Sequence, residues 1–317
     1  MNFQFGDYLI VVLYFVIVLF VGFRASKNKG AQKSDDEFLL AGRRLTTPFF
    51  VATLVSTWYG NILGVGEFVF SNGVSAWVCF GLPYYVTGII FALFFAKRIR
   101  NFNVSSIPEQ IRTKYGATAG IISSIIVLVI TIPAAYVLML GVFIKLFVGW
   151  DLWICIIAGA VLSIIYLFKG GFASAVKTNT VQFILMYLGF ASLIFFCVVT
   201  FGSPLNLISI LPKSYFTLTG NNSWQVIAVW FIISLQTFID PSFHQRCSAA
   251  ITPNTARNAI LISVLFWIIF DSMTLLAGLY ARAYFPNISP IDSFTMLGSA
   301  VMPYLWKGFF VVSMIAT

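Results

Sequence analysis

The sequence predicts an all-α protein that crosses a membrane several times. Of its 317 residues, 60% are hydrophobic, only 9% are charged, and 34 are phenylalanines. Apolar runs recur along the whole chain, and many reach the roughly 20 residues that a helix needs to cross a bilayer. A polytopic membrane protein is therefore expected rather than a water-soluble domain.

Eight membrane spans and the start of a ninth are predicted, because charges or turn residues bound each apolar run. We place them at residues 6–24, 47–70, 76–97, 117–147, 151–168, 180–201, 223–243, 258–281 and from 303 onward. The first run has membrane length and lacks the basic start of a signal peptide, so we expect it to remain as a span.

The basic residues predict the orientation in the cell membrane. With the N-terminus outside, 15 of the 19 lysines and arginines fall in inner loops and the other 4 in outer loops. Inner loops of membrane proteins are enriched in positive charge, so this distribution favours an outside N-terminus. The net charge of +9 then follows from topology. We expect the bilayer as a partner and no nucleic acid.

The second span is poorly suited to a continuous helix in lipid. Five unfavourable residues lie in its second half: Gly60, Asn61, Gly64, Gly66 and Glu67. Glycine costs about 1 kcal/mol relative to alanine in a helix, and polar side chains are costly in lipid. A broken span is tolerated where its backbone lines a cavity, and the freed carbonyls can then bind a cation. The alternative is a small-residue face for helix packing.

The seventh span is expected to kink or unwind near Asp240, because Pro241 removes a backbone donor and clashes with the preceding turn. Two broken spans five apart run antiparallel, which predicts an inverted repeat. We expect three regions. They are 1–46, an extra N-terminal helix and loop; 47–201, a five-helix repeat; and 202–317, an external loop and a second, truncated repeat.

Two loops have specific turn chemistry. Ser106 is expected to cap a short helix that ends at Gly116. Residues 169–180 are expected to form a tight turn at Gly170 and Gly171 before the sixth span.

Four stretches resemble the sodium:solute symporter family, in the family's order. They are DEFLLAGRRL (Asp36–Leu45); Pro108-Glu109 with Lys114–Gly116; Gly170–Phe172 with Thr178 and Gln182; and Gln245-Arg246 with Ala249-Ala250. The resemblance implies a leucine-transporter-type fold and Na⁺-coupled symport of a small organic solute by alternating access. It also implies that the chain stops inside the eighth core helix.

The resemblance also implies a Na⁺ site. Its ligands would be the backbone carbonyls of Ser56 and Tyr59 at the break and of Thr317. Na⁺ is a hard cation that prefers oxygen, so the chemistry is consistent, and Na⁺ is the expected cofactor. Ser313 is interpreted as packing. Asn179 stands where the family usually has an acidic residue, so no ion-linked role is carried over to it.

Other polar or aromatic residues of the spans are candidates for solute contact or gating. Asp271 lies within an apolar segment and is a functional candidate by position, with a structural hydrogen bond as the alternative. Further solute candidates are Trp58, Asn61, Gln236 and Trp267, and gating candidates are Gly60, Gly64, Asp240 and Pro241. Asp240 could instead pair with Arg246. His244 is interpreted as loop structure.

Function classes outside transport are less consistent with the sequence. No HExxH, nucleophile elbow or aspartate-rich diphosphate motif is present, so an enzyme is not expected. The four cysteines stand alone and indicate neither a metal site nor a disulfide framework. The main alternative is a transporter-like sensor domain that feeds a downstream signalling module. The solute stays open among sugars, amino acids, monocarboxylates, vitamins and choline-like cations, and Asp271 favours a cationic or zwitterionic one.

Overall fold

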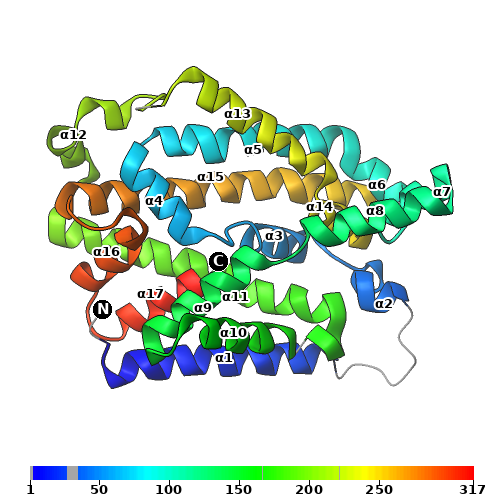
Figure 1. Cartoon of the computed structure of the whole chain (residues 1–317), viewed down its shortest axis with the longest axis horizontal. Coiled ribbons are helices and arrows are strands. Elements are labelled where there is room, and N and C mark those ends of the chain that lie inside the picture. Colours follow the sequence, from blue (N-terminus) through cyan, green and yellow to red (C-terminus); the bar gives the residue numbers. More distant parts are fainter. Residues whose placement is uncertain (1–2, 27–34, 166, 221) are drawn as a thin grey trace.

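The computed structural model describes residues 3–26, 35–165, 167–220 and 222–317, and these form a bundle of helices (Figure 1). The all-α expectation is confirmed. Six helical segments are long and apolar enough to cross a membrane: Phe5–Arg24, Trp77–Phe102, Ala117–Val148, Gly170–Phe201, Trp224–Ala249 and Pro253–Tyr284. Shorter apolar helices cover Thr47–Ser56, Ile62–Asn72, Leu152–Ile165 and Trp306–Ile315.

The α-helices follow the chain in this order: α1 Phe5–Ser26, α2 Asp35–Leu40, α3 Thr47–Ser56, α4 Ile62–Asn72, α5 Leu82–Phe91, α6 Lys97–Phe102, α7 Ile107–Tyr115, α8 Ala117–Ile130, α9 Ala134–Val148, α10 Leu152–Ile165, α11 Leu167–Phe201, α12 Leu207–Ile210, α13 Trp224–Ser234, α14 Pro241–Ala249, α15 Pro253–Tyr284, α16 Ser293–Val301 and α17 Trp306–Ile315. Two π-helical turns, Trp77–Gly81 and Ala92–Ala96, flank α5 and make one continuous segment with it and α6.

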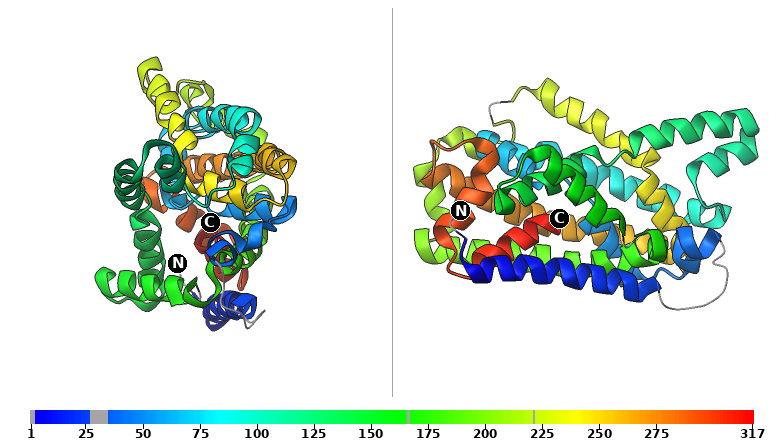
Figure 2. Two further views of the ribbon diagram at one scale, coloured as in Figure 1. Left: turned by 90° about the vertical axis from the view of Figure 1, so that its right-hand side faces the viewer. Right: turned by 60° about the horizontal axis from the view of Figure 1, so that its bottom comes forward.

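The broken helix α3–α4 lies at the centre of the bundle. Helices α11 and α15 both pack against α3. In Figure 1, α3–α4 and α13–α14 run in opposite directions along the long axis. The segments that we expect on the inner side of the membrane include α2, α6 and α7, and these lie at one end of the bundle. The N-terminus, α12 and α16 lie at the other end. Figure 2 shows α1 along the outside of the bundle.

Both predicted breaks are confirmed. Helix α3 ends at Ser56 and α4 begins at Ile62, so five residues of non-helical backbone separate them. Asp240 has extended backbone angles (φ −66°, ψ 116°) directly before α14. Glycine in the first break and proline in the second disfavour a continuous helix, as the sequence indicates.

Two other sequence-based expectations, the span at 117–147 and the turn at Gly171, are confirmed, and the structure adds detail to each. The span at 117–147 is divided at Thr131–Pro133 into α8 and α9, because Pro133 cannot continue the hydrogen-bond pattern of α8. Helical structure also resumes well before residue 180. Only Gly171 is non-helical within α11 (φ 59°), and a Cβ at this position would collide with the backbone of Phe38.

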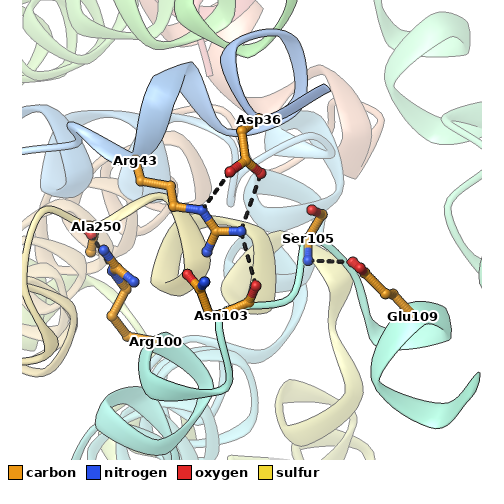
Figure 3. A network of polar contacts seen from close by, with 7 residues as sticks. All are labelled: Asp36, Arg43, Arg100, Asn103, Ser105, Glu109 and Ala250. Atoms are coloured by element: carbon orange, nitrogen blue, oxygen red, sulfur yellow. Dashed lines mark hydrogen bonds and ion pairs between the residues drawn. The ribbon is translucent and has the colours of Figure 1, made fainter. Parts of the chain in front are cut away.

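A polar network joins the chain segments at the end that carries α2, α6 and α7 (Figure 3). Arg43 donates to both carboxylate oxygens of Asp36, at 3.0 and 3.1 Å, and to the backbone carbonyl of Asn103. The hydrogen bond from Arg43 holds the pKa of the Asp36 carboxyl below its usual range. Arg100 donates to the carbonyl of Ala250, which fixes α6 against the end of α14.

The predicted short helix is confirmed as α7. The hydroxyl of Ser106 accepts a hydrogen bond from the backbone of Glu109 at 3.3 Å, and Gly116 ends the helix with φ 88°.

Helices α1 and α17 approach each other closely at Gly308. The carboxylate of Asp7, which is 1% exposed, accepts a hydrogen bond from the backbone of Gly308 at 2.9 Å. A Cβ on Gly308 would lie 2.7 Å from backbone atoms of Asp7. We expect Gly308→Ala to lower the free energy of unfolding by about 1–3 kcal/mol, because the two backbones have to separate.

Thermal unfolding of the purified protein measures this effect. Gly88→Ala is the matched control, since its Cβ would make an ordinary 3.4 Å contact with Val264. A neutral or stabilising result is expected for the control. Equal stability of the Gly308 variant and the wild type would contradict the close packing of α1 on α17.

Candidate functional site

The break between α3 and α4 frees backbone carbonyls in the middle of the bundle. The N–H of Trp58 bonds to Val55 at 3.2 Å, and the helical pattern resumes with Val65 bonding to Asn61 at 3.1 Å. Between these points, the carbonyl oxygens of Ser56 and Tyr59 accept no hydrogen bond from the described residues. Such oxygens are suited to a small hard cation.

Ser56, Tyr59 and Thr317, the three implied Na⁺ ligands, line one cavity of about 240 Å³. Ser56 is only 4% exposed, and its hydroxyl finds no hydrogen-bond partner among the described residues. Buried polar groups are normally paired, so an unpaired hydroxyl on a cavity wall indicates a place for a ligand or water. Ser313, by contrast, packs against Gly189 of α11, as expected.

The cavity lies between the break and helices α1, α9, α10, α11 and α17. Its polar lining consists of oxygen- and amide-bearing side chains: Tyr14, Ser56, Thr57, Tyr59, Tyr136, Ser163, Asn179, Gln182 and Thr317. Among the described residues, no carboxylate lines the cavity. A cation bound here would therefore be held by neutral oxygens.

Tyr136 of α9 closes over the break, and sequence reasoning missed it. Its hydroxyl donates to the carbonyl of Thr57 at 2.8 Å. Its ring lies so close to Gly60 that a side chain at that position would overlap it. Gly60 therefore has a steric reason to be glycine. The signal in the sequence was Pro133, which divides the span and redirects α9 toward the break.

Arg246 of α14 reaches the same break from another part of the chain. It is 4% exposed and donates to the carbonyl of Thr53 and the hydroxyl of Thr57, both at 3.0 Å. Asn179 donates to the hydroxyl of Thr53 at 2.7 Å, so α11, α3 and α14 share one network. The uncharged Asn179 thus stands beside a buried guanidinium.

Asp240 does not pair with Arg246, and that alternative is wrong. The carboxylate of Asp240 caps α14 by accepting from the backbone of Ser242 at 2.7 Å. A side chain engaged at a helix N-terminus satisfies a free N–H there, which is the local solution favoured for Asp before Pro. The interpretation of His244 as loop structure is wrong, because it lies within α14, where its ring contacts the carbonyl of Phe238 at 2.9 Å.

A second cluster forms where the break faces α5 and α15. The ring of Trp58 lies 4.8 Å from that of Trp267 and 5.0 Å from that of Tyr84. The hydroxyl of Tyr84 accepts from Gln236 at 2.9 Å. The indole N–H of Trp267, which is 1% exposed, finds no partner among the described residues. Four of the five solute candidates thus lie near one part of the break: Trp58, Gln236, Trp267 and Asp271. Asp271 is connected to it through its hydrogen bond with Tyr59.

Asp271 is bound by two tyrosines. The hydroxyl of Tyr59 donates to one carboxylate oxygen at 2.8 Å, and the hydroxyl of Tyr85 donates to the other. Tyr59 therefore borders the cavity and also contacts α15. Asn61 does not join this cluster. Its side chain is exposed and caps α4 by accepting from the backbone of Gly64 at 3.3 Å.

Comparison with known proteins shows to which family the chain belongs. The profile of the sodium:solute symporter family matches residues 38–317. The chain belongs to the sodium:solute symporter family. Its relatives include sodium-coupled monocarboxylate transporter 1 of Xenopus laevis, 24% identical over 323 residues, which cover 96% of this chain and 51% of that protein. The sodium:solute symporter family consists of transporters rather than enzymes.

Another relative is the high-affinity choline transporter 1 of Caenorhabditis elegans, 25% identical over 191 residues, which cover 56% of this chain and 33% of that protein. The chain spans about half the length of the monocarboxylate transporter. A solved structure of a Na⁺-coupled sialic acid symporter, in a substrate-bound outward-open state, matches with a TM-score of 0.82 at 16% identity. The match covers 99% of this chain and 71% of the symporter chain, which confirms the expected transporter fold.

Proposed function

We propose that the protein carries a small organic solute across the cell membrane together with Na⁺, by alternating access. The observation that carries this proposal is the cavity at the break, where Ser56, Tyr59 and Thr317 meet. Family membership supports Na⁺ as the coupling ion.

The proposed Na⁺ site uses the backbone carbonyls of Ser56, Tyr59 and Thr317. The first two accept no hydrogen bond from the described residues, so a cation need not displace an existing partner. Neutral oxygens hold Na⁺ without a fixed negative charge, so release is not opposed by a strong ion pair.

The proposed solute site is the aromatic cluster of Trp58, Tyr84 and Trp267 with Gln236. The unpaired indole N–H of Trp267 offers a hydrogen bond to a solute, and the aromatic faces offer apolar contact. The relatives are named for monocarboxylates and choline, so small organic solutes suit the family.

The proposed transport cycle depends on the two breaks. Non-helical backbone at Gly60 and at Asp240-Pro241 can absorb changes in backbone angle, and Gly64 adds freedom at the start of α4. The regions 1–46, 47–201 and 202–317 would act as an accessory helix and two inverted repeats. The N-terminus would lie outside, because the basic loops share one end of the bundle.

Thermal unfolding of the purified full-length protein in detergent tests the coupling ion. Na⁺ is titrated against K⁺ at constant ionic strength, with and without a panel of solutes. A ligand that binds only the folded state stabilises it by about 2.7 kcal/mol at 100 times its dissociation constant. We expect Na⁺, and not K⁺, to raise the unfolding temperature, and one solute to enlarge the shift. Equal shifts with both ions would contradict Na⁺ coupling.

A further inference from the structure

Asp271 lies in the middle of α15 and faces the interior of the bundle. Trp267 and Thr274, about one turn away on either side of the same helix face, are each 1% exposed. The side chain of Asp271 is nevertheless partly exposed. Its carboxylate points toward the break and α5 rather than lipid, because Tyr59 and Tyr85 both donate to it.

The carboxylate keeps acceptor positions that the described residues do not fill. Tyr59 and Tyr85 each donate one hydrogen bond to it, and a carboxylate has about four acceptor positions. Gly81 ends the π-helical turn beside it, and a Cβ there would lie 3.3 Å from the oxygen bound by Tyr85. That Cβ would also lie 2.7 Å from the hydroxyl of Tyr85, so the absence of a side chain at Gly81 lets Tyr85 reach the carboxylate.

In the part of the chain that the structure describes, Asp271 has no positively charged partner. Within the described residues, no lysine, arginine or histidine forms an ion pair with it. Arg246, the buried cation at the break, is bound instead to Thr53 and Thr57. A carboxylate inside a membrane protein is costly unless an opposite charge or strong hydrogen bonds accompany it. A positively charged ligand would supply the opposite charge for this carboxylate.

The two tyrosines that bind the carboxylate belong to aromatic pairs, and such pairs favour an organic cation. The ring of Tyr59 lies 4.5 Å from that of Phe270, and the ring of Tyr85 lies 5.9 Å from that of Trp77. Cations are attracted to aromatic faces within about 6 Å. An anionic solute would meet the carboxylate and be repelled.

We propose that the solute is an organic cation or zwitterion whose ammonium group is bound by Asp271, between Tyr59 and Tyr85. This assignment rests on the proposed solute symport and names the solute class for it. Tyr59 also links the two sites, because its hydroxyl holds Asp271 and its carbonyl is a proposed Na⁺ ligand.

The test uses thermal unfolding of the full-length protein in Na⁺, with choline, ethanolamine and proline as ammonium-bearing probes. The uncharged carbon analogue of choline, 3,3-dimethylbutan-1-ol, and the anion lactate serve as matched probes. We expect at least one ammonium-bearing probe to raise the unfolding temperature. The uncharged alcohol and lactate should leave it unchanged. Asp271→Asn should weaken that binding at least tenfold, and Asp271→Glu should retain part of it.

Two more variants separate charge from folding. Asp292→Asn makes the same charge change on an exposed side chain with no capping bond, so binding should be unchanged. Gly81→Ala keeps the carboxylate but places a methyl group 2.7 Å from the hydroxyl of Tyr85, so it displaces Tyr85 and should also weaken binding. These results would still test the site if Asp271→Asn failed to fold.

Three results would overturn the assignment: no stabilisation by any ammonium-bearing probe, stabilisation by lactate that Asp271→Asn leaves unchanged, or loss of the solute-free Na⁺ shift in Asp271→Asn. The last would make Asp271 a Na⁺ ligand. Failure of symport itself is recognised separately, because the wild type would then show no Na⁺-specific shift without solute.

Discussion

Replacing Ser56 with proline is expected to abolish the Na⁺-specific rise in unfolding temperature. Helix α3 ends at Ser56, and proline there removes a backbone donor and clashes with the preceding turn, at a cost of about 3 kcal/mol or more. The backbone would move, and the carbonyl groups of Ser56 and Tyr59, the proposed Na⁺ ligands, would move with it. The measurement is the Na⁺ titration of thermal unfolding against K⁺.

Ser56→Ala is the matched control, because it keeps the backbone carbonyl and removes only the unpaired hydroxyl. Its stability without Na⁺ should equal or exceed that of the wild type, since a buried unpaired polar group is lost. Its Na⁺ shift should persist. An intact Na⁺ response in the proline variant would refute the placement of the ion at this break.

Replacing Asn179 with aspartate is expected to tighten Na⁺ binding roughly tenfold. No carboxylate lines the cavity among the described residues, and Asn179 is on its wall. Opposite charges about 8 Å apart attract by about 2 kcal/mol at an effective dielectric constant of 20. The new carboxylate would also offset the guanidinium of Arg246, which shares Thr53 with Asn179.

The Na⁺ concentration that gives half of the thermal shift measures this affinity. Asn206→Asp, at an exposed position in the 3₁₀ turn Pro204–Asn206, makes the same substitution away from the cavity and should leave the value unchanged. An unchanged or weaker affinity in Asn179→Asp would show that Na⁺ does not occupy this cavity, or that the wall at Asn179 lies too far from it.

Both helix breaks could be predicted from the sequence, because glycine and proline act on the backbone at their own position. The cap at Ser106 and the stop at Gly116 are local in the same way. Local rules failed where two local effects compete. Pro133 divides a long apolar run, and Asp240 caps its own helix rather than pairing with Arg246 six residues later.

Which residues meet at the site could not be predicted from local sequence. Asp271 is 212 residues from Tyr59 and 186 from Tyr85, yet the two hydroxyls bind its carboxylate. Arg246 reaches Thr53 across 193 residues. No periodicity or composition encodes which residues meet over such separations.

The sequence by itself determined that the chain is a helical membrane protein with two unwound spans, because apolar length, charge distribution and backbone chemistry are properties of short segments. The family was indicated separately, by the resemblance of four motif stretches. Only the tertiary structure decided that Ser56, Tyr59 and Thr317 line one cavity, and that two tyrosines bind Asp271 with no ion pair to it among the described residues. Those features depend on which helix faces pack together, and packing is a property of the whole bundle.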